Sequence, residues 1–135
     1  PWMPLAPGTQ YFAWDIYSDM IDFINGFFSL VNQAGRAEVH DVIALAETPR
    51  VDLALVLKTI PCLEQVDKSA GSQLLSAIQA RYLLVSFPMR SLGGRSKGMP
   101  EHYETSFERL AADQPWRIQR FEFSSELVFL VDKGI

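Results

Sequence analysis

The chain has 135 residues, of which 48% are hydrophobic, so it can bury one core and a single domain is the default expectation. Its formal net charge of −4 provides no overall attraction for nucleic acid, so an RNA partner would require a local concentration of positive charge. The single cysteine, Cys62, excludes an internal disulfide and fits a reducing cytoplasm, and no apolar run reaches the roughly 18 residues of a membrane span. The chain begins at Pro1 without an initiator methionine, and we expect it to be a fragment.

The first part of the chain predicts a strand, a helix and a second strand. Residues 11–15 form a short apolar run that ends in a carboxylate, as in a buried strand with a functional tip. Ser18 or Asp19 can cap the following helix, whose apolar residues recur at helical spacing, and Gly35 is placed to end it. Residues 37–41 predict a second short strand, which also closes on an aspartate.

The middle of the chain predicts two buried strands around a helix. Residues 51–57 are an almost unbroken apolar run of strand length. Residues 63–80 predict a helix that is interrupted near Gly71, and residues 82–87 predict the next strand, which Pro88 stops.

The last part predicts a loop, a helix and a hairpin. Residues 91–98 are rich in glycine and serine, and residues 101–112 predict a polar helix. Residues 116–123 and 126–131 predict two strands that are joined tightly.

This alternation predicts an α/β fold with a largely parallel sheet and an antiparallel hairpin at its C-terminal edge. Ligands of such sheets bind beyond the carboxyl ends of the parallel strands. Asp15, Asp41, Lys58 and the segment 86–88 all fall at those ends. We therefore expect the functional site at this edge.

Two of these residues suit an adenosine ligand. A carboxylate such as Asp15 at a strand tip can accept both hydroxyls of a ribose, and Asp41 with the amide of Val42 can bind the edge of an adenine. The alternatives are a helix-capping role for Asp15 and the general tendency of α/β proteins to end strands on aspartate.

Lys58 directly follows a strand and is expected at the same edge. It could position an anionic or electron-rich substrate, or it could simply extend from the end of the sheet into solvent. Glu64 lies in the opening of the next helix, where it could pair with Lys58 or favour the helix N-terminus electrostatically. Gln65 could contact a ligand.

Residues 89–99 hold the one local concentration of positive charge, with three cations and no acid. Glycines allow close approach of the backbone to a phosphate, and arginine suits phosphate or guanine contacts. The alternative is a solvated flexible loop. No metal site is expected, because His40, His102 and Cys62 lack the spacing of metal ligands.

Two long strings resemble a known family. VDLALVLKTIPCLEQ at residues 51–65 and RYLLVSFPMRSLGGRSKGM at residues 81–99 closely resemble the aminoglycoside-resistance 16S rRNA methyltransferases, which modify N7 of the guanine at position 1405. The resemblance continues through YFAWDI, HDVIA, HYETSFERL and FSSELVFLVDK, and so covers nearly the whole chain.

The resemblance implies a Rossmann-like methyltransferase that uses S-adenosyl-L-methionine to methylate 16S rRNA within the 30S subunit, and a cytoplasmic protein without a membrane or metal partner. By position it implies three groups of site residues: Asp15, Ile16, Asp41, Val42, Leu57 and Gln65 for the cofactor; Lys58 and Glu64 for activity; and Arg90, Arg95 and Lys97 for RNA.

The chain also departs from the family pattern. The family's first strand and glycine-rich cofactor loop would lie before Pro1, as would its helical N-terminal domain. Residues 1–135 are therefore expected to be the C-terminal part of a single catalytic domain, inactive on their own. Two other interpretations remain: a methyltransferase of the same fold with another substrate, and a truncated or degenerate fragment without activity.

Overall fold

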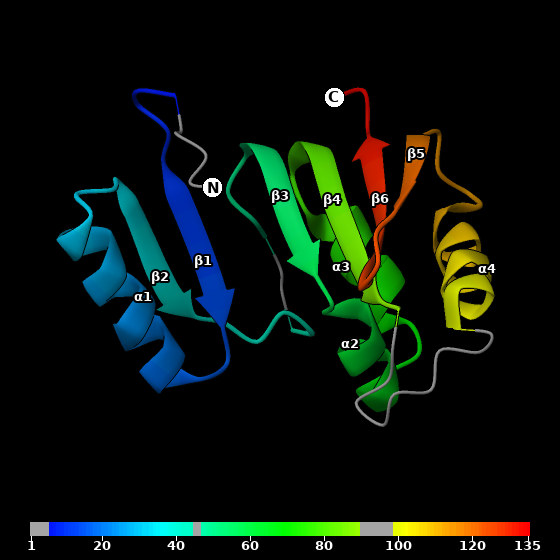
Figure 1. Cartoon of the computed structure of the whole chain (residues 1–135), viewed down its shortest axis with the longest axis horizontal. Coiled ribbons are helices and arrows are strands. Elements are labelled where there is room, and N and C mark those ends of the chain that lie inside the picture. The colour runs from blue at the N-terminus through cyan, green and yellow to red at the C-terminus, as the bar shows by residue number, and fades with distance from the viewer. Residues whose placement is uncertain (1–5, 45–46, 90–98) are drawn as a thin grey trace. The chain divides into compact units, whose positions relative to one another are not determined.

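The computed structural model describes residues 6–44, 47–89 and 99–135. These residues form two compact units, Pro1–Leu45 and Ala46–Ile135 (Figure 1). None of the described helices has both the length and the apolar character needed to cross a membrane.

The first unit is a β-α-β unit. Strand β1 (Tyr11–Asp15) pairs in parallel with β2 (Gly35–Val39), and helix α1 (Ser18–Leu30) connects them. Parallel pairing requires such a crossover, because the chain must return to the start of the sheet before the second strand begins. Both strands and the helix were predicted, although β2 lies two residues earlier than expected.

Two local signals in this unit were misread. Gly35 begins β2 and does not end α1: a Cβ at this position would lie 2.9 Å from the ring of Phe28 and 3.0 Å from Cβ of Tyr11, so only glycine allows this close packing. The N-cap residue of α1 is Tyr17, without a side-chain cap, and neither Ser18 nor Asp19 caps the helix; the Asp19 carboxylate accepts a hydrogen bond from the N–H of Met20.

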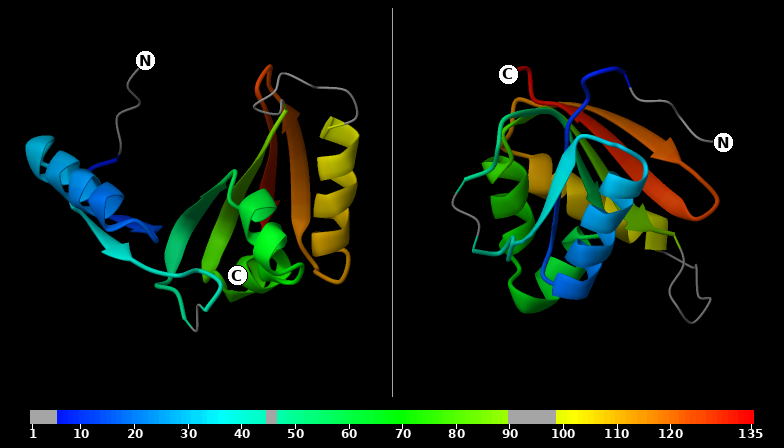
Figure 2. Two further views of the ribbon diagram at one scale, coloured as in Figure 1. Left: turned by 90° about the horizontal axis from the view of Figure 1, so that it is seen from below. Right: turned by 90° about the vertical axis from the view of Figure 1, so that its left-hand side faces the viewer.

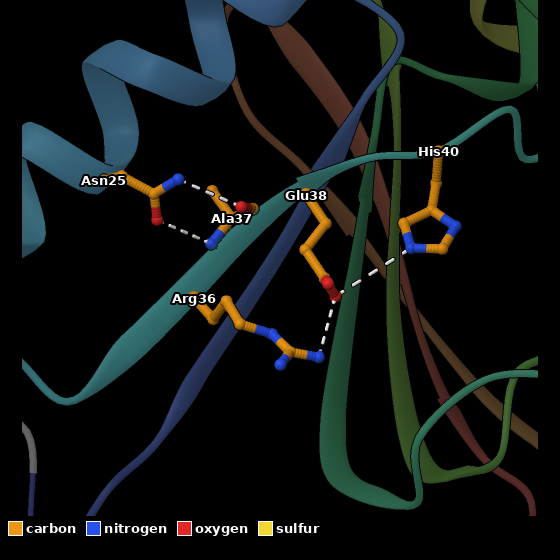
Figure 3. A network of polar contacts seen from close by, with 5 residues as sticks. All are labelled: Asn25, Arg36, Ala37, Glu38 and His40. Atoms are coloured by element: carbon orange, nitrogen blue, oxygen red, sulfur yellow. Dashed lines mark hydrogen bonds and ion pairs between the residues drawn. The ribbon is translucent and has the colours of Figure 1, made fainter.

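Helix α1 is joined to β2 by one asparagine. The Asn25 side chain donates to the carbonyl of Ala37 (3.0 Å) and accepts from its N–H (2.9 Å), as Figure 3 shows. Ala37 is 5% exposed, so its backbone groups would otherwise be poorly hydrated at the outer edge of the sheet. Asn25 therefore acts as a substitute for a neighbouring strand.

The second unit contains a four-stranded sheet in the order β3-β4-β6-β5. Strands β3 (Val51–Leu57) and β4 (Ala80–Pro88) are parallel, and the C-terminal hairpin of β5 (Arg117–Glu122) and β6 (Glu126–Asp132) adds two antiparallel strands. The predicted α/β fold with a C-terminal hairpin is confirmed. The described strands form two sheets, however, because no strand pairing joins β1 or β2 to β3.

The predicted helix over residues 63–80 is two helices, α2 (Ile60–Val66) and α3 (Ala70–Ala77). The break lies at Asp67, whose carboxylate accepts hydrogen bonds from the N–H (2.8 Å) and hydroxyl (2.7 Å) of Ser69. Gly71 was expected near the break but is buried inside α3, where a Cβ would lie 3.1 Å from Ile60. Its lack of a side chain lets α2 and α3 pack closely.

The core of the second unit lies on one face of its sheet, beneath α2, α3 and α4 (Met99–Ala111) (Figure 2). Phe107 of α4 stacks on Phe129 of β6, with ring centroids 4.1 Å apart. Six strand residues of this face are at most 3% exposed: Leu83, Val85, Phe87, Leu127, Phe129 and Val131.

The opposite face of this sheet is open and apolar. Leu53, Leu55 and Leu57 alternate along β3 away from the core and are 50%, 48% and 51% exposed. Phe121 of β5 lies on the same face. It is opposite Val128 of β6, which is opposite Ser86 of β4, which in turn is opposite Leu57 of β3, and residues opposite each other in a sheet share a face. We call Leu53, Leu55, Leu57 and Phe121 the open face.

Candidate functional site

Asp15 lies at the carboxyl end of β1, as predicted. Its carboxylate Oδ1 accepts a hydrogen bond from the N–H of Tyr17 (3.0 Å), which is a local turn contact before α1. Within the described residues the second carboxylate oxygen has no hydrogen-bond donor. The following Ile16 is 58% exposed. The structural role of Asp15 therefore leaves one carboxylate oxygen available to a ligand.

Asp41 follows β2 at the same edge of the first sheet. Val39, the last residue of β2, pairs with Asp15, so Asp41 lies just beyond this pair. Its Oδ1 accepts a hydrogen bond from the N–H of Ile43 (2.9 Å), and Val42 between them is half-buried. The structure thus brings the two predicted carboxylates of this unit to one edge, each held by a short turn.

His40, which directly precedes Asp41, contacts side chains that stabilise the fold. Its ring lies 4.7 Å from the ring of Trp14. Its Nε2 lies 3.9 Å from a carboxylate oxygen of Glu38, and this carboxylate also pairs with Arg36 at 3.0 Å (Figure 3). No group of three or more His, Cys, Asp or Glu side chains that could hold a metal ion occurs among residues 6–44, 47–89 and 99–135.

Lys58 follows β3 with an unusual backbone conformation. Its φ is 56°, in the left-handed region that non-glycine residues rarely occupy, and its N–H donates to the carbonyl of Ser86 (3.0 Å). Its ammonium lies 2.8 Å from a carboxylate oxygen of Glu126, the first residue of β6. The hydrogen bond from Lys58 is the main reason that the pKa of Glu126 lies below its usual value, and the Ser86 hydroxyl lowers it further against the opposing effect of burial.

The structure therefore assigns Lys58 a different partner from the one that its sequence neighbourhood suggested. Glu64 lies in the middle of α2, half-buried, and is not within ion-pair distance of Lys58. Glu126 could not be found from spacing along the chain, because it reaches Lys58 only through the pairing of β6 with β4. Only the register of β6 against β4, which places Glu126 opposite Pro88, could have predicted that Glu126 lies near the end of β3.

The remaining predicted contacts of the second unit are exposed. Leu57 ends β3 with 51% of its surface accessible, and Gln65 is exposed near the end of α2. Arg90, Arg95 and Lys97 lie outside the described residues. The segment that contains them follows Met89, whose N–H donates to the carbonyl of Ser125 (3.0 Å), next to Glu126.

Two surface depressions of the second unit lie away from this edge. One of about 450 Å³ is lined by Arg50, Val51, Asp52, Gln79, Arg81 and Ile135, at the amino ends of β3 and β4. None of these residues belongs to the predicted site. The edge that carries Lys58 and Glu126 is a better candidate, because ligands of α/β sheets bind at the carboxyl ends of parallel strands.

The parallel strands and the C-terminal antiparallel hairpin have the arrangement of a Rossmann-like methyltransferase fold, which solved methyltransferase structures share. The chain matches the crystal structure of 16S rRNA methyltransferase RmtF in complex with S-adenosyl-L-homocysteine, with a TM-score of 0.81 and 34% identity, over 90% of this chain and 46% of that chain. Magnesium protoporphyrin IX methyltransferase from Synechocystis, at 14% identity and a TM-score of 0.65, shares the fold alone, over 90% of this chain and 63% of its own.

The chain belongs to the ribosomal RNA methyltransferase (FmrO) family, whose model matches residues 1–130. It is 37% identical over 133 residues to the 16S rRNA (guanine(1405)-N(7))-methyltransferase of Micromonospora rosea, and 39% identical over 130 residues to that of Frankia casuarinae. These matches cover 98% and 96% of this chain but 48% and 46% of the relatives. The chain thus spans about half the length of the curated relatives it matches, and the family resemblance of its strings is confirmed.

Proposed function

We propose that the protein carrying this chain transfers a methyl group from S-adenosyl-L-methionine to N7 of the guanine at position 1405 of 16S rRNA, within the 30S subunit. The observation that carries this proposal is the 37% identity to a methyltransferase of that named specificity over 98% of the chain. Modification of this guanine implies cytoplasmic action and resistance to aminoglycosides that require the unmodified base.

We also propose that residues 1–135 are the C-terminal part of one catalytic domain. Residues from both units align with a single solved methyltransferase, because the match to RmtF covers 90% of the chain. The division into two units is compatible with one domain, since β1 and β3 each have a strand partner on only one side among the described strands.

The residues at the strand ends fit the proposed cofactor. In the first unit, Asp15 and Asp41 each keep a carboxylate oxygen that no described donor occupies, and such oxygens can accept the hydroxyls of a ribose or the amino group of an adenine. Ile16 and Val42 flank these carboxylates, and in the second unit Leu57 and Gln65 are the proposed cofactor contacts. When bound, S-adenosyl-L-methionine supplies an electrophilic methyl group.

The proposed reaction requires positioning more than proton transfer. Guanine N7 carries a lone pair in the neutral base, so no base has to remove a proton before attack. Holding the reacting atoms in line can lower the barrier by about 7–11 kcal/mol. Lys58 is already paired with Glu126, which suits it to orienting the target base and not to accepting a proton. We propose that Glu64, on α2, supports activity without pairing with Lys58, and that Arg90, Arg95 and Lys97 contact RNA.

Methylation of 30S subunits tests the proposal directly. The protein carrying this chain should transfer labelled methyl groups to 30S subunits, and primer extension should locate the product at guanine 1405. Transfer to another substrate, or no transfer at all, would contradict it.

The RNA assignment has its own test. Arg95→Ala and Lys97→Ala should each reduce 30S methylation and lower the salt dependence of 30S binding by about one unit of slope per lost phosphate contact. Cofactor affinity should stay unchanged. If the triple substitution of Arg90, Arg95 and Lys97 leaves methylation unchanged, the assignment fails.

A further inference from the structure

The hydroxyl of Ser86 is a buried polar group to which the proposed reaction assigns no role. Ser86 is 0% exposed, and its Oγ has no hydrogen-bond partner among the described residues. A buried hydroxyl without a partner destabilises a fold, so most such groups are paired. A serine held in this state near a candidate site calls for a functional explanation.

Ser86 lies between the two members of the Lys58–Glu126 ion pair. On β4 it is the parallel partner of Leu57, and its own carbonyl accepts the N–H of Lys58 at 3.0 Å. On the other side it pairs with Val128 of β6, two residues from Glu126. Residues two apart on a strand share a face, so the Ser86 and Glu126 side chains are diagonal neighbours on one side of the sheet.

We infer that Ser86 is a positioning residue for the proposed methyl transfer: its hydroxyl turns toward the Glu126 carboxylate and stabilises it in the orientation that holds the Lys58 ammonium. One residue would then fix Lys58 at both ends, through its carbonyl at the backbone and through Glu126 at the side chain. The lowered pKa of Glu126, to which Lys58 contributes most and the Ser86 hydroxyl less, agrees with this arrangement.

The first test uses the 135-residue chain without cofactor or RNA, so its outcome is independent of the proposed function. Carbon-detected NMR can follow the titration of the Glu126 carboxyl in Ser86→Ala. The pKa should rise, because the carboxylate loses a nearby donor. The matched control is Ser106→Ala, which removes another buried hydroxyl, 6% exposed, from α4. This control should leave the Glu126 pKa unchanged.

The second test measures methylation by the protein that carries this chain. Although the inference depends on the proposed function here, the NMR result stands even if no methylation is found. Ser86→Ala should lower kcat about tenfold, the worth of one hydrogen bond to a charged group, with little change in KM. Ser86→Thr, which keeps the hydroxyl, should restore most of the rate. Ser86→Ala should lower thermal stability only slightly at pH 7, because the carboxylate that loses this donor stays paired with Lys58.

The results separate a positioning role from simple packing. If Ser86→Ala leaves the Glu126 pKa or the kcat unchanged, the inference is overturned and Ser86 only fills space. Should the alanine variant not fold, Ser86→Cys provides the same comparison, because a thiol of similar shape is only a weak donor.

Discussion

Lys58 and Glu126 form an ion pair at 2.8 Å between the end of β3 and the start of β6, two strands that are not neighbours in the sheet. The pair spans the carboxyl end of β4, so both side chains reach across Ser86. It is the contact by which the C-terminal hairpin takes part in the candidate site.

Glu126→Gln should release the Lys58 ammonium while changing the fold little. Both side chains are partly exposed, so we expect a loss of stability of only about 0.5 kcal/mol together with a clear loss of methylation. Because the pKa of Glu126 is lowered, the contribution of the pair is complete above the usual value of 4.5 and is lost as the pH falls through the lowered value. Urea unfolding from pH 7 to pH 2 should therefore show this acid-dependent loss in the wild type only.

Lys58→Met provides the second arm of a double-mutant cycle with Glu126→Gln. If the two substitutions lower activity additively, the residues act separately and the pair has no joint role. Glu122→Gln on β5, which affects a different ion pair, is the matched control.

Asn25→Leu should destabilise the first unit by about 1–3 kcal/mol, because it leaves the N–H and carbonyl of Ala37 without partners. Hydrogen exchange at the Ala37 amide should accelerate together with this loss. Asp22→Ala on the exposed side of the same helix is the control and should change neither quantity. An unchanged exchange rate in Asn25→Leu would show that another group satisfies this edge.

Lys133→Met should alter stability in a pH-dependent way. The Lys133 ammonium donates to the carbonyls of Leu75 (2.6 Å) and Ile78 (2.8 Å), and burial lowers its pKa. Between the lowered value and the usual 10.5 the unfolded chain binds more protons than the folded one, so this residue makes stability rise with pH there. The variant should lose that slope and about 1–3 kcal/mol at neutral pH.

The control for this prediction is Lys68→Met, which removes an exposed lysine. Chemical denaturation at pH 7 and at pH 10 measures the slope in all three proteins. Equal slopes in the wild type and Lys133→Met would contradict the assigned effect of burial.

The open face should make the 135-residue chain associate. Each half-exposed leucine can gain about 1 kcal/mol by burial against another apolar surface. Leu55→Glu should shift the sedimentation coefficient toward that of a monomer, whereas Gln119→Glu, with the same change of charge on the same sheet face, should not. A wild-type chain that sediments as a monomer at tens of micromolar would exclude this role for the open face.

The sequence predicted the strand ends of the candidate site but not the contacts across strands. Asp15 and Lys58 were found because each closes or directly follows an apolar run, and Asp41 because it closes a short predicted strand; these patterns depend only on local order. Glu126 and Ser86 were missed, because their proximity to Lys58 depends on the register of β3, β4 and β6. Asp67 was missed for another reason: its turn resembles a continuing helix until its hydrogen bonds to Ser69 are seen.

The left-handed backbone at Lys58 lowers stability at the residue to which the proposed function assigns the orientation of the target base. A side chain at φ 56° costs roughly 1–2 kcal/mol that glycine would not incur. A screen for heat resistance alone should therefore favour Lys58→Gly, and it would discard the ammonium together with the strain. On the proposed function, selection for resistance to an antibiotic should reverse that preference, so the variant with the higher melting temperature should methylate 30S subunits more slowly.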